Sequence, residues 1–207
     1  MTGLFKVHTY LQGKERTLFV AIMKNVFSEL KCELVYDLKG STIGRTARTG
    51  KDDGRVSGIL KDLDWVRDNH KWNLDKGLQS YISQVIESDV QFLTSINVMD
   101  YSLLLGIHTI KGNADSYIKH LTRPIDLAVK YPNGAKKAIH NTFRGGVISR
   151  DKSCIYMFAI IDIYTYYSGS KAAENFFKTI VYGKGISSVK PEIYGARFKK
   201  FIFQQFS

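Results

Sequence analysis

The spacing of apolar residues predicts a strand-rich beginning to the chain. Residues 4–11 and 17–24 both have strand-like patterns, and the segment Gln12–Arg16 between them contains a glycine, so we expect a β-hairpin. The apolar pattern changes over Lys24–Phe27. A further strand is expected over Glu33–Leu38, where it ends at a glycine-containing turn.

Helical periodicity is strongest from about Asn73 to Ile96. Apolar residues recur there at three- and four-residue intervals, and Asn73 is the expected cap. Residues 46–58 are polar and glycine-rich, which indicates an exposed loop, whereas Leu60–Trp65 is a short amphipathic segment. Helices are also expected over Lys171–Tyr182 and in the last twenty residues, with Pro191 near the helix start.

Two apolar segments carry a carboxylate where a buried strand is expected. Val98–His108 contains Asp100 near its beginning, and Ile155–Tyr164 contains Asp162 near its end. A carboxylate on a buried strand is costly unless it is paired, hydrogen-bonded or bound to a metal. The alternative is that Asp100 lies at the entrance of its strand, half solvated, and caps a turn.

The order of these elements favours an α+β fold with an antiparallel sheet. Strands and helices mix without a βαβ rhythm, and the pattern is lost between about Thr109 and Ser153, which predicts a long excursion. A chain of 207 residues with 44% hydrophobic and 13% aromatic residues is long enough for one domain with a substantial core.

The net charge limits the classes of binding partner, and the cysteine content indicates the cellular compartment. The formal net charge of +11 favours a polyanion, which leaves nucleic acid, an anionic membrane and phosphorylated small molecules open. Two cysteines, Cys32 and Cys154, are too few for a disulfide framework and indicate free thiols in an intracellular protein. No spanning segment or signal peptide is found, so we expect a cytoplasmic protein, either soluble or peripheral at the cytoplasmic face of a membrane.

Three polar positions lie at the ends of apolar strands: Asp37-Leu-Lys39, Asp100 and Asp162. Two strand-borne carboxylates and a lysine beside a glycine turn are groups that phosphoryl transfer requires. The alternative is three unrelated strand ends. Neither a P-loop nor a His-Arg-Asp motif is present, and the histidines and cysteines lack zinc-site spacing; His108 is expected to be a satisfied edge histidine.

Five motifs, spread over nearly the whole chain, occur in the order found in phosphatidylinositol phosphate kinases. They are Asp37-Leu-Lys-Gly-Ser-Thr42, Leu60-Lys-Asp-Leu-Asp64, Met99-Asp-Tyr-Ser-Leu-Leu-Leu-Gly-Ile-His108, Ile160-Ile-Asp-Ile163 and Ser188-Val-Lys-Pro-Glu-Ile-Tyr-Gly-Ala-Arg-Phe198. The chain therefore resembles the catalytic lobe of that protein kinase-related family. The resemblance implies ATP- and Mg²⁺-dependent phosphorylation of a hydroxyl on a phosphorylated inositol ring.

The resemblance also implies roles for individual residues. Asp100 would be the catalytic aspartate that faces the substrate hydroxyl, Asp162 would hold Mg²⁺ on the nucleotide phosphates, and Lys39 would offset charge near those phosphates. A hinge segment would hydrogen-bond adenine through its backbone, and it comprises Met23, Lys24, Asn25 and Val26. Arg45 and Lys171 would contact phosphate groups of the substrate or, for Arg45, of the nucleotide.

The chain departs from the family pattern at three places, of which the smallest is Thr109, where the family usually has an acid. The chain begins at about the last two strands before the hinge, so we expect residues 1–24 to be the remainder of a truncated nucleotide-binding lobe, 24–27 the hinge and 28–207 the C-lobe. The nucleotide site would then be open on one side. In the specificity loop, Lys171 matches the first lysine of the family's pair and Ala172 replaces the second.

These departures keep alternative functions open. A phosphatidylinositol phosphate is the favoured substrate, and soluble inositol polyphosphates are a close second because the basic loop is reduced. A non-catalytic phosphoinositide-binding pseudokinase is the alternative from another class. Retention of Lys39, Asp100 and Asp162 together argues against it. Nucleic-acid binding is not expected.

Overall fold

A six-stranded sheet organises the computed structural model, which describes residues 3–27, 30–48, 58–121, 128–130, 136–138, 142–143, 146–168 and 190–207. The sheet has the order β4-β3-β6-β11-β10-β9, and every pair is antiparallel except β3–β4. Its strands are β3 (Leu34–Leu38), β4 (Leu60–Lys61), β6 (Ser102–Thr109), β9 (Thr142–Phe143), β10 (Gly146–Ile148) and β11 (Cys154–Ile161). The expected α+β class with an antiparallel sheet is confirmed.

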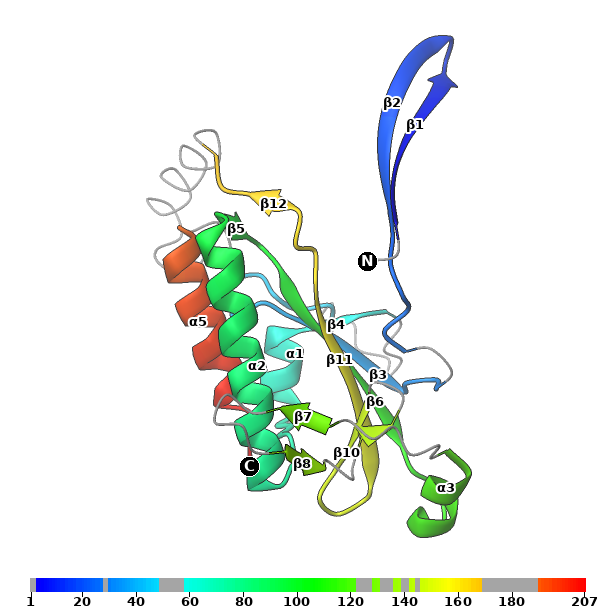
Figure 1. Cartoon of the computed structure of the whole chain (residues 1–207), viewed down its shortest axis with the longest axis vertical. Coiled ribbons are helices and arrows are strands. Elements are labelled where there is room, and N and C mark those ends of the chain that lie inside the picture. The colour runs from blue at the N-terminus through cyan, green and yellow to red at the C-terminus, as the bar shows by residue number, and fades with distance from the viewer. Residues whose placement is uncertain are drawn as a thin grey trace.

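The remaining described elements are helices and two-stranded ribbons (Figure 1). The helices are α1 (Asp62–Arg67), α2 (Lys76–Ser95), α3 (Ala114–Leu121) and α5 (Pro191–Phe203). Three two-stranded ribbons complete the described elements: β1 (Gly3–Leu11) with β2 (Lys14–Ile22), β5 (Val98–Met99) with β12 (Thr165–Tyr166), and β7 (Ala128–Lys130) with β8 (Lys136–Ala138). The described part of the expected excursion over 109–153 therefore contains regular structure.

The main core joins the sheet to two long helices. Helices α2 and α5 lie side by side (Figure 1), and their buried faces belong to one apolar cluster with the central strands. The helices contribute Leu78, Ile82, Ile86, Val90, Leu93, Tyr194, Phe198 and Ile202, and the strands contribute Tyr36, Leu38, Leu103, Leu105 and Tyr156. Burial of a large apolar side chain contributes about 1.5–3 kcal/mol, so this cluster fixes α5 against the sheet.

Helix α2 confirms the strongest periodic pattern but corrects its cap. The N-cap is Asp75, whose side chain accepts a hydrogen bond from the Leu78 N–H, and not Asn73. Asn73 instead lies in the preceding loop, where its backbone N–H donates to the Tyr156 hydroxyl. Two residues at helical spacing, Val85 and Ile96, are exposed, because each lies at the border of the buried face.

Both apolar segments are broken at the carboxylate, so Asp100 and Asp162 lie at strand ends, as the sequence indicated. Asp100 separates β5 from β6, and Asp162 separates β11 from β12. Both residues have a left-handed backbone, with φ of 64° and 59°. This conformation costs L-residues free energy, although aspartate adopts it more readily than most.

The expected N-terminal hairpin is confirmed with a shorter turn. Strands β1 and β2 are joined by Gln12 and Gly13 alone, both with positive φ, as in the turns that suit the twist of a two-residue hairpin. In Figure 1 the hairpin extends away from the sheet.

Several other expectations have clear outcomes. The C-terminal helix with Pro191 in its first turn is confirmed as α5, and Cys32 and Cys154 are free thiols. The expected helix over 171–182 lies outside the described residues.

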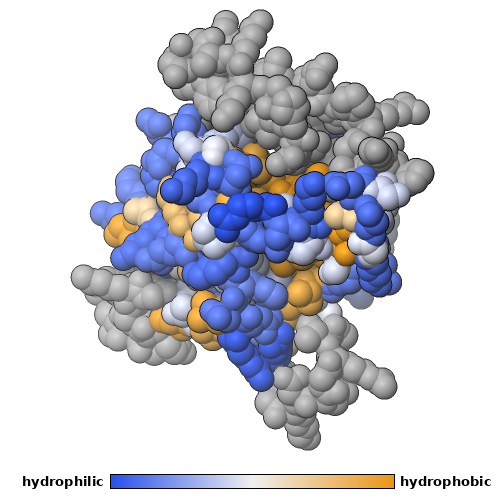
Figure 2. Space-filling view, turned by 90° about the horizontal axis from the view of Figure 1, so that it is seen from below, coloured by the Kyte–Doolittle hydropathy of each residue, from blue (hydrophilic) through white to orange (hydrophobic). Residues whose placement is uncertain are grey.

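Within the described ranges, no helix is both long and apolar enough to cross a bilayer. Figure 2 shows a mainly hydrophilic face with apolar residues in small patches.

Removal of the α2 cap should lower stability without changing the fold. We expect Asp75→Ala to reduce the free energy of unfolding by about 1 kcal/mol, because the Leu78 N–H loses its acceptor. Urea unfolding followed by circular dichroism measures this change. The exposed mid-helix variant Ser88→Ala is the control and should stay within about 0.5 kcal/mol of wild type.

The turn between β10 and β11 should make stability depend on acid pH. The hydrogen bond from the Ser149 hydroxyl, together with those from the Ser153 hydroxyl and N–H, lowers the pKa of Asp151 to about 2. The folded state therefore favours the ionised form, and this stabilisation is present above the ordinary pKa of about 3.9 and lost as the pH falls towards 2.

Asp151→Asn removes this titration. Between pH 5 and about pH 2.5, the free energy of unfolding of wild type should fall more steeply than that of the variant. Parallel slopes in urea titrations at several pH values would contradict the assignment.

Candidate active site

Three neighbouring strands end at one edge of the sheet and bring the predicted site residues together. In β3 and β6, Leu38 lies opposite Leu103, and in β6 and β11, Ser102 lies opposite Ile161. Lys39, Asp100 and Asp162 follow or precede these rungs directly. Neighbouring strands lie about 4.8 Å apart, so the register places the three residues at one site.

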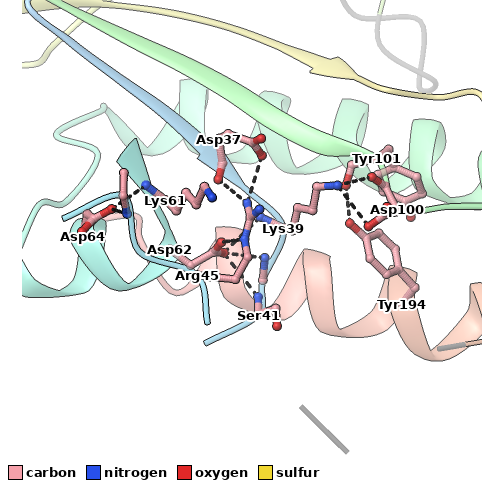
Figure 3. A network of polar contacts seen from close by, with 12 residues as sticks. Asp37, Lys39, Ser41, Arg45, Lys61, Asp62, Asp64, Asp100, Tyr101 and Tyr194 are labelled. Carbon is pink, nitrogen blue, oxygen red and sulfur yellow. Dashed lines mark hydrogen bonds and ion pairs between the residues drawn. The ribbon is translucent and has the colours of Figure 1, made fainter. Parts of the chain in front are cut away.

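Lys39 crosses this edge to the strand break (Figure 3). Its Nζ donates to the Asp100 carbonyl oxygen at 2.7 Å and to the Asp100 Oδ1 at 3.0 Å. The side chains of Lys39 and Asp100 are 13% and 33% exposed, so the contact is sheltered but reachable from solvent. A protonated amine has three N–H donors, and this arrangement leaves one for an oxygen of a bound phosphate.

The short ribbon beyond the breaks holds the two aspartates at the same level. Met99 of β5 lies opposite Thr165 of β12. The two segments therefore pair again on the far side of Asp100 and Asp162 from the main sheet. Left-handed residues persist where surrounding structure determines them, and here each break is paired on both sides.

Asp162 is exposed at this edge, and no described residue hydrogen-bonds its carboxylate. Within the described part of the chain, no group of three or more histidine, cysteine or carboxylate side chains gathers around a common point. Magnesium does not require such a group, because one or two carboxylates, substrate phosphates and water usually complete its shell. The residues present therefore fit a phosphate-bound magnesium ion better than a preformed protein metal site.

Asp62 is the main residue of this region that the spacing argument did not identify. It is fully buried at the start of α1, and its Oδ1 accepts hydrogen bonds from the N–H groups of Gly40 at 2.7 Å and Lys39 at 3.0 Å. Ser41 N–H also points to Oδ1 at 3.3 Å. The turn that carries Lys39 is thus folded around one buried carboxylate (Figure 3).

Arg45 completes the surroundings of Asp62. Its Nε donates to Asp62 Oδ2 at 2.8 Å, and its Nη2 donates to the carbonyl oxygen and Oδ1 of Asp37 at 2.6 and 3.0 Å. Burial raises the pKa of Asp62, whereas Arg45 and the neighbouring N–H groups act in the opposite direction. Burial alone would lower the pKa of Arg45, but its hydrogen bond to Asp62 raises it above the ordinary value. Arg45, predicted to contact phosphate, is therefore engaged with two carboxylates.

Asp62 belongs to the motif Leu60-Lys-Asp-Leu-Asp64, which carries a second buried acid. Asp64 is also buried, and it accepts hydrogen bonds from the Thr46 hydroxyl and from the N–H groups of Ala47 and Lys61. Both acids lie in the first turn of a short helix, where a carboxylate is favourable. In the sequence they resemble solvent-exposed charges of an amphipathic segment, so only their partners reveal their role.

The predicted hinge lies next to the site. Met23 Sδ accepts a hydrogen bond from the Tyr164 hydroxyl at 3.6 Å, which connects the hinge to the segment that follows Asp162. Phe27 packs against β6, where Gly106 has no side chain; a Cβ there would lie 2.6 Å from the Phe27 ring. Lys24 and Asn25 are exposed and Val26 is half-buried.

Two further predictions can be placed. His108 is satisfied as expected, because its ring nitrogens contact the Lys31 carbonyl oxygen at 2.7 Å and the Tyr117 hydroxyl at 2.6 Å. Lys171, predicted to bind substrate, lies outside the described residues.

Comparison with known proteins gives one consistent family. A family model described as Phosphatidylinositol-4-phosphate 5-Kinase matches residues 1–205. A phosphatidylinositol 4-phosphate 5-kinase of Plasmodium falciparum (isolate 3D7) is 33% identical over 98% of this chain and 12% of its own length. Phosphatidylinositol 5-phosphate 4-kinase type-2 alpha of Mus musculus is 32% identical (97% and 55%), and the type-2 gamma protein of Homo sapiens is 31% identical (91% and 53%). The chain thus spans about half, or less, of these relatives.

Asp62→Asn tests whether the buried carboxylate organises the site. An amide nitrogen cannot accept the hydrogen bonds of Arg45 or the turn, and the Arg45 charge loses its buried partner. We expect the free energy of unfolding to fall by about 3 kcal/mol or more.

Asp37→Asn is the matched control, because Asp37 pairs with the same arginine but is 23% exposed. Its effect should be clearly smaller in the same urea titration. Equal effects would show that burial of Asp62 is not what matters.

Proposed function

Since the chain belongs to the phosphatidylinositol phosphate kinase family, we propose that it transfers the γ-phosphate of ATP to a ring hydroxyl of a phosphatidylinositol phosphate. One observation carries the proposal: Lys39 hydrogen-bonds Asp100 at the sheet edge where Asp162 ends the neighbouring strand. A positioned carboxylate, a second carboxylate and a sheltered lysine are the groups that this transfer needs.

In this proposal Asp100 orients the attacking hydroxyl and accepts its proton. Its carboxylate is 33% exposed, so a substrate hydroxyl can reach it from solvent. The Lys39 contact restricts the carboxylate to one orientation, and its remaining N–H offsets negative charge on the transferred phosphoryl group.

Asp162 would hold Mg²⁺ against the nucleotide phosphates. The ion, when bound, neutralises charge that develops between the β- and γ-phosphates. The exposure of Asp162 at the end of β11 supports this role.

The segment 24–27 with Met23 would be the adenine hinge. Its support is the Met23–Tyr164 contact, which places the segment beside the residues that follow Asp162. Met23–Val26 would then bind adenine, and Lys39 would contact the phosphates.

The names of the relatives and the charge of the chain support the proposed substrate class. The relatives are named for phosphatidylinositol phosphates, and a net charge of +11 favours a phosphorylated headgroup in an anionic membrane. We assign Lys171 to headgroup phosphate. Arg45 contributes by supporting the turn that carries Lys39, since its donors go to Asp37 and Asp62.

The proposal is tested with the full chain, labelled ATP and Mg²⁺. One arm contains anionic vesicles with phosphatidylinositol phosphates, and the other contains soluble inositol polyphosphates. We expect phosphate transfer in the vesicle arm, and a fall of at least about 100-fold in Asp100→Asn and in Asp162→Asn. Asp115→Asn, which removes an exposed ion pair with Lys152, is the control and should keep wild-type turnover.

Three other outcomes would contradict parts of this proposal. Transfer only to soluble inositol phosphates would move the activity away from lipid. No transfer in either arm, with phosphoinositide binding retained, would identify a binding module. Turnover of Asp162→Asn at the wild-type rate would remove that residue from the site.

A further inference from the structure

Helix α5 contacts the strand break that carries Asp100. Tyr194 is fully buried, and its hydroxyl donates a hydrogen bond to the Tyr101 carbonyl oxygen (Figure 3). The two rings meet edge to face with centroids 4.8 Å apart, and Phe198 packs on the Tyr101 ring at 5.2 Å. A residue more than ninety positions away in sequence thus holds the backbone next to Asp100.

The break has two consecutive carbonyl groups outside the strands, and a side chain binds each one. The Asp100 carbonyl accepts from Lys39, and the Tyr101 carbonyl accepts from Tyr194. An unpaired carbonyl at a buried position is costly, so these two donors determine how the chain passes through the left-handed residue.

The position of α5 depends on its close approach to α2. A Cβ on Gly195 would lie 2.8 Å from Val90 Cγ1 and 3.1 Å from Thr94 Oγ1, so only glycine permits this distance. Burial raises the pKa of Tyr194 well above its ordinary value, which keeps the hydroxyl protonated as a donor. The rigid contact of two helices therefore fixes the donor that reaches Tyr101.

We infer that Tyr194 is a positioning residue for the proposed phosphoryl transfer. It binds the Tyr101 carbonyl and thereby holds the neighbouring Asp100 carboxylate in place. Lys39 binds Asp100 itself, so the two side chains hold adjacent residues of the break. This inference rests on the proposed function. A displacement of about 1 Å at a reacting group costs up to about 100-fold in rate, so loss of this one hydrogen bond should be visible in kcat.

Tyr194→Phe removes the hydroxyl and keeps the ring. Tyr156→Phe is the matched control: Tyr156 is also buried, and its hydroxyl accepts from the Asn73 N–H at 3.1 Å. It lies opposite Ile107, five rungs from the Ser102–Ile161 pair, or about 17 Å along the ladder. The Tyr156 hydroxyl also donates to the Lys71 carbonyl oxygen at 3.4 Å, so this control loses two part-buried hydrogen bonds and Tyr194→Phe loses one buried hydrogen bond, but only Tyr194 lies beside Asp100.

Kinetics are measured well below the melting temperature of both variants, with folding confirmed by circular dichroism. We expect Tyr194→Phe to lower kcat about tenfold with KM for ATP unchanged, and Tyr156→Phe to keep kcat within twofold of wild type. Equal kcat in the two variants, or a Tyr194→Phe chain that does not fold, would overturn the inference, since the hydroxyl would then serve stability alone.

Amide hydrogen exchange separates this inference from the proposed function. Residues 100–102 should exchange faster in Tyr194→Phe than in wild type and Tyr156→Phe, whether or not the chain is active. A wild type without turnover refutes the proposed function, and exchange alone then decides whether Tyr194 holds the break. Unchanged exchange at these residues would overturn the positioning role.

Discussion

The contact between Lys39 and Asp100 joins the ends of β3 and β6 just beyond the Leu38–Leu103 pair, where their ladder stops. Lys39 follows β3, Asp100 precedes β6, and the amine binds both the carbonyl and the carboxylate of the aspartate. An aspartate with φ of 64° needs such support, because its backbone leaves the sheet at this point. The position of the Asp100 carboxylate at this edge therefore depends on the way this break is held.

The buried carboxylate of Asp62 stabilises the turn that carries Lys39. Asp62 gathers the N–H groups of the turn that carries Lys39, and Arg45 offsets its charge. Desolvation of an ion pair is expensive, so this arrangement contributes more to the unique position of Lys39 than to net stability. On the other side, Tyr194 and the α2–α5 contact hold Tyr101. Elements from three distant parts of the chain therefore determine the placement of one carboxylate.

Much of the fold was predictable because it depends on local pattern. The β1–β2 hairpin, strand β3, the long helix α2 and the start of α5 at Pro191 all follow from periodicity and turn residues. The errors have physical reasons. Asp75 and Asn73 are both good caps, and only the path of the preceding loop selects Asp75. The strand ends at Asp100 and Asp162 were expected, but the left-handed backbone at each residue and the β5–β12 ribbon beyond them were not.

The sequence by itself determined which residues bear the candidate chemistry and in what order: Lys39, Asp100 and Asp162, each at an apolar strand end. Only the tertiary structure decided which of them meet. The register of β3, β6 and β11 brings the three ends to one edge, and it depends on long-range pairing that local pattern does not encode. The partners of Asp62 and Tyr194 were hidden for the same reason, since a buried polar side chain is identified only by the donors and acceptors that folding places around it.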